Sequence, residues 1–408
     1  MNKEQMQSNR KIVRWLTYIM FMMFAMTSDA VGVNIPEIIK EFSLSLTQAS
    51  AFHYTTMIAI ALSGVLFGFL ADKIGRKRTI VIGLFLFGIS CFLFAAGNNF
   101  TFFLALLALS GAAIGIFKTG ALALIGDIST STSEHTGTMN TVEGFFAVGA
   151  IIGPAIVSAL LVYGLHWKYL YMIAGAMCVA LLLFALTVKY PETKAATSEH
   201  AGLARTLKMM ANPYALGFSM AIALYVATEV AIYVWMPTFL QDYSGSLLWL
   251  STYALTIFFV FRALGRFMGA WILQRYNWTS VMLVFSLAIF LCFLGSMIFG
   301  TTAAVLLLPL SGLFMSMIYP TINSKGISCF EKSEHGTVAG VILFFTAVAA
   351  AVGPLIMGFV GDVFGNVKFG FYVATGFAGL LFLGMLYNFI KNPAEAIHAT
   401  QDKAVYSV

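Results

Sequence analysis

The sequence has few charged residues. Asp, Glu, Lys and Arg together make up 10% of its 408 residues, whereas a soluble globular domain contains about 25%. Apolar residues make up 60%, and the mean hydropathy is +0.89. A water-soluble fold must cover itself with polar groups, and this composition does not supply enough of them. The composition excludes a soluble enzyme, a nucleic-acid-binding protein and a disordered chain, and it indicates a protein that is solvated by the lipid bilayer.

The sequence also lacks the motifs of metal, disulfide and nucleotide chemistry. Its four cysteines are scattered and form no CxxC pair, so neither a disulfide framework nor a metal site is indicated. No phosphate-binding loop, zinc motif or nucleophile elbow occurs. We therefore expect no catalytic residue, no metal and no cofactor. An ion gradient, rather than ATP, is the expected driving force.

Long apolar segments recur along the chain. Each is about 20 residues or longer, the length that a helix needs to cross a bilayer, whereas a barrel strand would alternate over about 10 residues. At roughly 34 residues for a helix and its loop, the 408 residues predict twelve helices. The predicted fold class is an all-α membrane protein with twelve transmembrane helices. The predicted spans are 12–36, 47–71, 79–96, 101–125, 138–163, 168–188, 213–240, 248–273, 279–299, 303–327, 337–361 and 370–390.

Two short motifs occur twice, at the same offset. The tripeptide Ser133-Glu134-His135 recurs as Ser333-Glu334-His335, and Gly153-Pro154 recurs as Gly353-Pro354; both offsets are 200 residues. Two matches at one offset, in spans of the same rank, indicate a duplicated six-helix half. Duplicated halves around a central site are the plan of many secondary transporters.

The longest polar interval lies near the middle of the chain. It predicts an N-terminal six-helix bundle over 1–190, a cytoplasmic linker over 191–212 and a C-terminal six-helix bundle over 213–408. Basic residues gather before the first span, after the second span and in the linker. Because cytoplasmic loops carry an excess of Lys and Arg, we expect both termini to be cytoplasmic. The first apolar run is expected to be a retained helix rather than a cleaved signal.

A compact loop motif follows the second span. Gly68 permits close helix packing, and Asp72 ends a helix where its carboxylate can pair with a cation or cap another helix. Gly75 allows a tight turn, and the basic run with Arg76 and Lys77 anchors the loop at the cytoplasmic face. This pattern resembles the cytoplasmic loop signature of the major facilitator superfamily. The resemblance implies two pseudo-symmetric six-helix bundles that rock about a midplane site.

Four segments narrow the resemblance to the fucose permease family of proton-coupled sugar symporters. They are similar to its helices 7, 8, 10 and 11 and comprise Tyr225–Glu229, Gly265–Arg275, Phe314–Ile327 and Met357–Asn366. The resemblance covers most of the chain and implies proton-coupled sugar transport in a bacterial inner membrane.

The sequence departs from that family at positions that matter. Lys118 stands where the family has a glutamate implicated in sugar binding and proton coupling. Asp29 lies three residues before the position of the family's essential aspartate. Glu143 replaces a glutamine, whereas Asn140 is retained, and Arg262 replaces an aromatic or apolar residue. The resemblance therefore implies the fold and the general chemistry, and it leaves the particular sugar and the coupling route open.

Charges inside a span cost at least ~2.5–3.5 kcal/mol each at its centre, so each is expected to be functional or paired. At about 1.5 Å per residue, Lys118 and Glu143 lie at one level, which predicts that they pair. This pair is either structural or breaks and re-forms as substrate or proton arrives. Asp29 lies higher and is the first candidate to take up the proton, with Arg262 as its expected partner across the cavity. Glu229 is the second candidate, and Glu143 is also among the predicted proton-coupling residues.

Arg266 is expected at the cytoplasmic side, as a gate or a structural pair. A sugar-binding site needs hydrogen-bonding groups and flat aromatic faces. Tyr233 and Trp235 suit such a site, but they equally suit an aromatic belt at a span end. The predicted substrate-binding residues are His53, Tyr54, Lys118, Asn140, Glu143, Tyr225, Tyr233, Trp235, Arg262, Tyr319 and Asn323.

The sequence therefore predicts a monomeric, multi-pass inner-membrane protein whose partners are a small solute, protons and lipid, with no nucleic acid. We expect proton-coupled symport of a sugar or sugar-like solute. Two cations, Lys118 and Arg262, would suit an anionic solute such as a sugar acid. A proton-driven exporter of drugs or metabolites remains the alternative, favoured by the Gly149-x-x-x-Gly153-Pro154 motif, which also serves for helix packing. A transporter-like receptor is disfavoured because its added cytoplasmic domain is not seen.

Overall fold

A computed structural model describes residues 3–44, 46–191, 202–240 and 243–404. Helices make up nearly all of these ranges, and no strand occurs within them. Helices suit apolar sequences because they satisfy every backbone N–H and C=O group within the segment when no water is available.

The helices follow one another with short connections. In chain order they are α1 (Lys3–Ser28), α2 (Val31–Phe42), α3 (Leu46–Phe67), α4 (Leu70–Lys73), α5 (Arg76–Ala96), α6 (Phe100–Ile128), α7 (Thr132–Val162), α8 (Tyr169–Thr187), α9 (Leu203–Met210), α10 (Pro213–Leu240), α11 (Leu248–Thr252), α12 (Ala254–Arg275), α13 (Trp278–Ile298), α14 (Thr301–Met315), α15 (Ile318–Ile327), the 3₁₀ turn η1 (Lys332–Glu334), α16 (His335–Val363), α17 (Lys368–Lys391) and α18 (Glu395–Ala404).

Eleven helical segments of the described chain are long and apolar enough to cross a membrane. They correspond to eleven of the twelve predicted spans. The remaining predicted span, 12–36, covers the later part of α1 and the first part of α2. The helix α1 has 26 residues, and its first part is polar and basic. The helix α9 lies inside the predicted linker over 191–212, so part of that linker is helical.

The first predicted span is not one continuous helix. We predicted a single helix over 12–36, but α1 ends at Ser28 and α2 begins at Val31, which leaves Asp29 in the break between them. The Ser28 hydroxyl donates to Asp29 Oδ2 over 2.8 Å. Serine and aspartate are residue types that favour helix ends, because their short polar side chains can compete with the helical backbone for hydrogen bonds.

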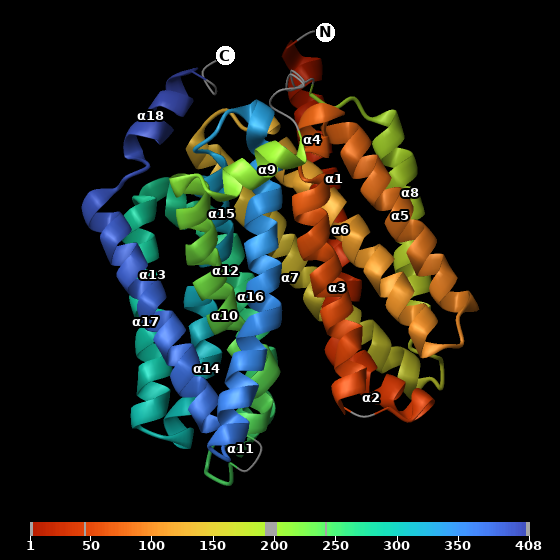
Figure 1. Cartoon of the computed structure of the whole chain (residues 1–408), viewed down its shortest axis with the longest axis vertical. Helices are drawn as coiled ribbons and strands as arrows, with labels where there is room; N and C mark the ends of the chain where they lie inside the picture. Colours follow the sequence, from red (N-terminus) through yellow and green to blue (C-terminus); the bar gives the residue numbers. More distant parts are fainter. Residues whose placement is uncertain (1–2, 45, 192–201, 241–242, 405–408) are drawn as a thin grey trace. The chain divides into compact units, whose positions relative to one another are not determined.

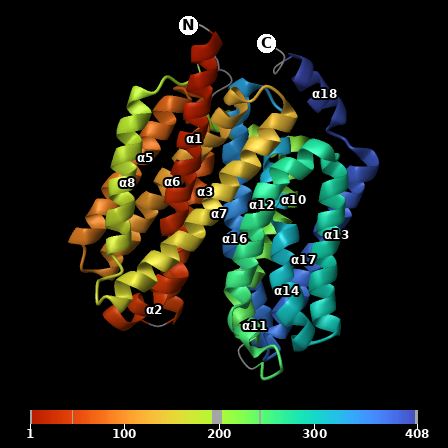
Figure 2. The ribbon, with the colours of Figure 1, turned by 180° about the vertical axis from the view of Figure 1, so that it is seen from behind.

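Contacts divide the chain into two compact units. Unit 1 comprises Met1–Thr130, Phe145–Ala215 and Phe330–Ala347. It therefore contains α1 to α6, α8 and α9, together with the later part of α7 and the first part of α16. Within it, α5 lies beside both α6 and α8, as Figures 1 and 2 show.

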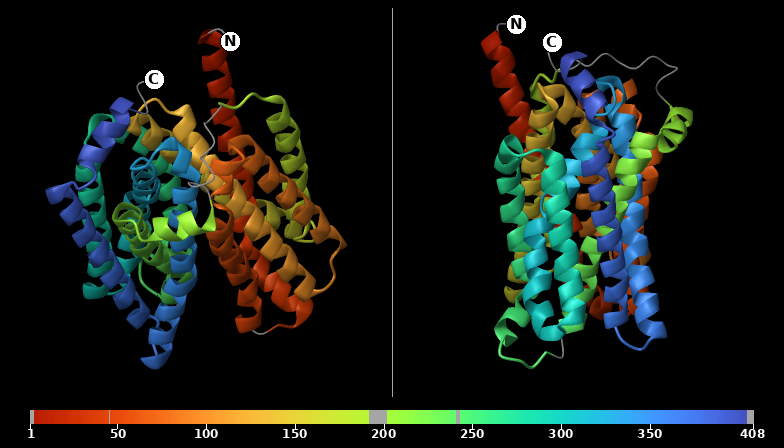
Figure 3. Two further views of the ribbon diagram at one scale, coloured as in Figure 1. Left: turned by 45° about the horizontal axis from the view of Figure 1, so that its top comes forward. Right: turned by 90° about the vertical axis from the view of Figure 1, so that its left-hand side faces the viewer.

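Unit 2 comprises Ser131–Gly144, Leu216–Cys329 and Val348–Val408. It contains the first part of α7, the helices from α10 to α15, the later part of α16, and α17 and α18. In this unit α13 lies between α14 and α17, and the right-hand view in Figure 3 shows long helices of this unit side by side. The predicted division of the chain into two six-helix bundles, separated by a linker over 191–212, was based on the sequence repeat and the polar interval, and it stays a prediction.

Glycines allow the backbones of unit 1 to approach closely. A Cβ atom on Gly153 would lie 2.0 Å from the Met26 carbonyl oxygen, and one on Gly149 would lie 2.0 Å from that of Met22. Such a distance is a steric clash, so α7 can lie against α1 here only because these positions carry no side chain. Helix packing therefore accounts for the glycines that precede Pro154.

Candidate functional site

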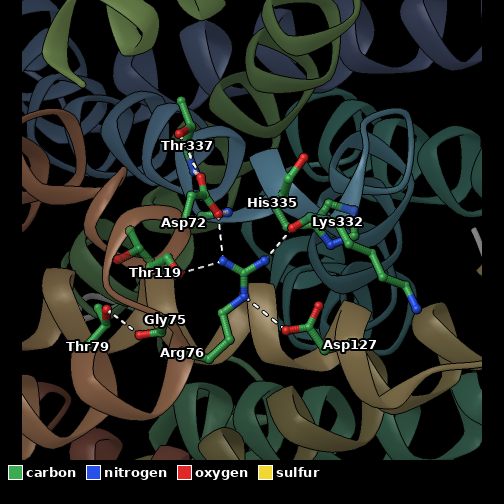
Figure 4. A network of polar contacts seen from close by, with 12 residues as sticks. Asp72, Gly75, Arg76, Thr79, Thr119, Asp127, Lys332, His335 and Thr337 are labelled. Carbon is green, nitrogen blue, oxygen red and sulfur yellow. Dashed lines mark hydrogen bonds and ion pairs between the residues drawn. The ribbon is translucent and has the colours of Figure 1, made fainter. Parts of the chain in front are cut away.

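The loop motif after α3 forms a buried network centred on Arg76 (Figure 4). Arg76 Nε contacts Asp127 Oδ2 at 3.0 Å, and Arg76 Nη1 contacts Asp72 Oδ1 at 2.6 Å. The other guanidinium nitrogen donates to the Lys332 carbonyl oxygen. All three charged side chains are almost completely buried. A planar guanidinium with five N–H donors suits this site because it can serve two carboxylates and a carbonyl together.

Asp72 also caps the start of α16. Its carboxylate accepts hydrogen bonds from the backbone N–H groups of Gly336 at 2.9 Å and Thr337 at 2.7 Å, and from the Thr337 hydroxyl at 2.7 Å. The first N–H groups of a helix lack partners within the helix, and the helix dipole favours negative charge there. The motif acid therefore binds a guanidinium and a helix N-terminus at once.

The other motif residues fit the same loop. Gly75 has a φ of +92°, in the region that glycine adopts most readily. A Cβ on Gly68 would lie 3.0 Å from the Gly340 Cα, so these two glycines permit a close helix crossing. The Lys77 ammonium donates to the carbonyl oxygens of Leu186 at 2.8 Å and Val188 at 2.9 Å, which caps the C-terminal end of α8.

A second group of charges lies inside unit 2. Glu229 of α10 and Arg262 of α12 form an ion pair, with Arg262 Nε 2.9 Å from Glu229 Oε1. The Tyr225 hydroxyl, one helical turn from Glu229, donates to the same carboxylate oxygen. All three residues are buried. Pairing of this kind is what allows opposite charges to stay inside a membrane span.

A second ion pair lies beside the first. Arg266 Nη1 is 3.6 Å from Glu143 Oε2, and it donates to the Glu143 backbone carbonyl at 2.9 Å. Arg266 Nε donates to the Ser316 carbonyl at 3.4 Å, and the Arg266 side chain is 1% exposed. We predicted Lys118 as the partner of Glu143; the ion pair that the structure gives Glu143 is with Arg266. A contact between Lys118 and Glu143 would join the two units and stays a prediction.

Buried amides and a tyrosine accompany these pairs. Asn140 donates to the Thr321 hydroxyl at 3.3 Å and to the carbonyl one turn earlier at 3.0 Å. The Tyr319 ring lies 6.3 Å from the Tyr225 ring. The Asn323 side chain is completely buried, and its amide nitrogen and oxygen have no hydrogen-bond partner among the described residues. Buried polar groups are normally satisfied, so Asn323 is an exception in this site; its binding of a solute stays a prediction.

The predicted substrate-binding residues of unit 1 lie beside aromatic rings. The Lys118 ammonium lies 4.5 Å from the centre of the Phe146 ring and 5.9 Å from that of Phe21, which is cation–π geometry. His53 and Tyr54 are half-buried and have ring centres 5.9 Å apart. The expected pair of Asp29 with Arg262 joins the two units and stays a prediction. In unit 2 the ion pair of Arg262 is with Glu229.

The two aromatic residues near the end of α10 differ in their contacts. The Trp235 indole N–H donates to the Pro354 carbonyl oxygen at 3.2 Å, which ties α10 to α16 within unit 2. Tyr233 stacks with Phe259 at 6.4 Å between ring centres. The hydrogen bond of Trp235 explains its position by helix packing. Substrate binding by either residue stays a prediction.

Sequence reasoning missed several polar residues. Asp127 follows the predicted span over 101–125 and is the second carboxylate of the Arg76 network. At the other end of unit 1, Glu41 accepts from the Trp167 indole N–H at 2.9 Å and lies 3.3 Å from both His166 Nε2 and Lys168 Nζ. Asp127 lies in the last turn of α6 and Glu41 near the end of α2, and the partners of Glu41 lie between α7 and α8. Isolated polar residues at helix ends carry no periodic signal. Within the described ranges, no cluster of three His, Cys, Asp or Glu residues is arranged to hold a metal ion.

The chain is similar in sequence to a family of known transporters. Residues 17–354 match the family described as the Major Facilitator Superfamily. The L-fucose-proton symporter of Escherichia coli (strain K12) is 26% identical over 411 residues, which cover 90% of this chain and 91% of that protein. The quinolone resistance protein NorA of Staphylococcus aureus is 26% identical over 366 residues, which cover 84% and 87% of the two chains.

Solved structures show the same fold. The transporter FucP in its outward conformation has a TM-score of 0.78 and 22% identity, and the alignment covers 93% of this chain and 99% of FucP. The proton:xylose symporter XylE has a TM-score of 0.76 and 12% identity, over 93% of this chain and 96% of XylE. The fold of this chain is therefore the all-helical fold of these transporters.

Proposed function

Because the chain belongs to the major facilitator superfamily, whose similar members are transporters rather than enzymes, we propose that it is a proton-coupled symporter. It imports a sugar or sugar-like solute across the bacterial inner membrane by alternating access, with both termini in the cytoplasm. The similarity to the L-fucose-proton symporter supports this proposal.

One observation carries the coupling part of the proposal. Glu229 and Arg262 form a buried ion pair, and the Tyr225 hydroxyl donates to the same carboxylate. A proton that binds Glu229 removes the negative charge and leaves the Arg262 guanidinium without its counter-charge. A carboxylate on the solute can then take that place. Proton binding and anion binding would thus favour each other, which is the requirement for symport of an acidic sugar.

Asp29 is the other proton-binding candidate, because it lies at the break between α1 and α2. Discontinuous membrane helices often form substrate and ion sites, since their ends expose backbone groups. The buried amides Asn140 and Asn323 and the ring of Tyr319 provide the hydrogen-bonding and aromatic groups that a sugar requires.

The test is transport by the full chain in liposomes with an inward proton gradient. The panel comprises neutral sugars, sugar acids and cationic dyes. We expect gradient-driven accumulation of a sugar or sugar acid, and its loss in Asp29→Asn or Glu229→Gln. Glu395→Gln, which changes an exposed carboxylate on α18, is the matched control and should transport normally. Unchanged accumulation in both Asp29→Asn and Glu229→Gln would refute the assigned proton sites.

The second candidate function is proton-driven export of drugs or metabolites. The similarity to NorA over 84% of the chain favours it. The motif before Pro154 does not add to that argument, because its glycines are required for packing against Met22 and Met26. Movement of dye against the proton gradient with no uptake of any sugar would establish export and overturn the symport proposal.

A further inference from the structure

The starts of α7 and α16 are related by the sequence repeat. Each lies at a Ser-Glu-His tripeptide, and the two copies are 200 residues apart. The first turn of α16 is capped by Asp72 from the loop motif. In the second half, the stretch from Gly269 to Asn277, which comprises the last turns of α12 and the connection to α13, contains no acidic residue. The loop there cannot supply a carboxylate to α7 as the first loop does to α16.

The C-terminal helix α18 supplies that carboxylate instead. Asp402 Oδ1 accepts from the Thr132 backbone N–H at 2.8 Å, and Asp402 Oδ2 accepts from the Thr132 hydroxyl at 3.1 Å. Asp72 contacts α16 through the same set of groups, a backbone N–H and a threonine hydroxyl. The Ser131 hydroxyl accepts a hydrogen bond from the Glu134 backbone N–H, also in the first turn of α7, at 3.0 Å. The carboxylate is also favoured by the positive end of the helix dipole.

A buried histidine holds α18 in place. His398 Nε2 lies 2.9 Å from the Lys325 carbonyl oxygen and 3.3 Å from Cys329 Sγ, and the imidazole packs edge-on against Trp278. Burial, and then the nearby Lys325 charge, lower the pKa of His398 to about 4, whereas the neighbouring Asp402 opposes this shift. His398 is therefore neutral at neutral pH, and its Nε2–H can donate to the Lys325 carbonyl.

The same helix ends also touch each other directly. His135 Nδ1 lies 2.5 Å from the Ser324 hydroxyl, and the Thr136 hydroxyl lies 2.9 Å from it. These contacts join the first turns of α7, from the first half of the sequence, to α15, from the second half. The helix α18 contacts α7 through Asp402 and the end of α15 through His398, so it bridges the two helix ends.

We propose that α18 is a latch that holds the start of α7 against the end of α15 and so stabilises the transporter with its cytoplasmic side closed. It takes over in the second half the role that the acidic loop motif performs in the first. The inference rests on the proposed alternating access, because the latch acts only if these helix ends separate during transport. Differential stabilisation of one state is what shifts a two-state equilibrium.

The test measures conformation without substrate or proton gradient, so its result is independent of the transport assay. Spin labels are placed at Lys189, after α8, and Gln274, near the end of α12; both side chains are exposed, and the four native cysteines are buried. In Asp402→Asn and in His398→Ala we expect the longer-distance population to increase, roughly doubling or more. Glu395→Gln removes one charge from the same helix and should leave the distances unchanged.

Hydrogen exchange provides the second measurement. Loss of the cap should speed exchange at the Thr132 amide about fivefold in Asp402→Asn, the usual effect of removing a helix cap. Faster exchange with unchanged label distances would show that α18 only caps α7, and it would overturn the latch. Unchanged exchange would show that the carboxylate does not hold the helix, with the same consequence. A normal melting temperature in each variant confirms that it is folded.

Discussion

Asp72 in unit 1 and Glu229 in unit 2 are both buried carboxylates beside an arginine, but they are held differently. Asp72 accepts two hydrogen bonds from the backbone of α16, and its partner Arg76 also binds Asp127 and a backbone carbonyl. The contacts of Glu229 come from two side chains, Arg262 and Tyr225. A carboxylate that is bound to backbone cannot leave without disturbing a helix, whereas side-chain partners can change rotamer. The first arrangement therefore suits a structural lock and the second suits an exchangeable pair.

The largest effect is expected from breaking the lock. Arg76→Ala leaves the carboxylates of Asp72 and Asp127 buried without their guanidinium, and removing one partner of a buried ion pair costs about 3–5 kcal/mol. We expect a strongly lowered melting temperature for the purified protein. Arg78→Ala is the matched control, because Arg78 belongs to the same basic run but is exposed. Equal melting temperatures of the two variants would contradict the comparison.

An intermediate effect is expected from the exchangeable pair. Glu229→Gln keeps the shape of the side chain and an acceptor for Tyr225 but removes the counter-charge of Arg262. We expect a folded protein whose gradient-driven uptake falls at least tenfold while solute binding persists. Glu143→Gln should affect uptake less, because Arg266 retains its hydrogen bond to the Glu143 backbone carbonyl. The comparison of the pairs is wrong if Glu143→Gln abolishes uptake and Glu229→Gln does not.

The smallest effect concerns pH and the second helix cap. The folded-state pKa of His398 is about 4, below its ordinary value of 6.5, so folding favours the neutral imidazole. The docking of α18 is therefore fully present above about pH 6.5 and weakens as the pH falls toward 4. We expect exchange at the Thr132 amide, relative to the intrinsic rate, to increase over this interval. In His398→Gln the interval should show no such change; a similar change there would assign it to Asp402 or to another group.

The apolar runs and the repeat carry much of the fold. Eleven of the predicted spans correspond to helical segments that can cross a membrane, because length and hydropathy are properties of the local sequence. The break at Asp29 was not predicted, since a run of apolar residues specifies the length of a span and not its continuity. Depth estimates placed Lys118 and Glu143 at one level. Depth does not give the direction in which a side chain points, so the pairing of Lys118 with Glu143 stays a prediction; the ion pair that the structure gives Glu143 is with Arg266.

The sequence identified charged residues of the candidate site but not the ion pair that Glu229 and Arg262 form. The residues that form it, such as Glu229 and Arg262, were identifiable because charge inside a span is costly. Their pairing was not, because Arg262 was assigned to Asp29. Asp402 was missed altogether, since it lies in a short polar helix that carries no hydropathy signal.

By itself the sequence determined that this protein lies in a membrane, that its two halves are related and that its loop motif belongs to a transporter superfamily. These properties follow from composition, local hydropathy and repetition, which do not depend on how helices are oriented about their axes. The tertiary structure decided which charges meet and which carboxylate caps which helix. The helix caps join residues more than two hundred positions apart, as Asp72 and Thr337 or Thr132 and Asp402 show, and only packing brings them together.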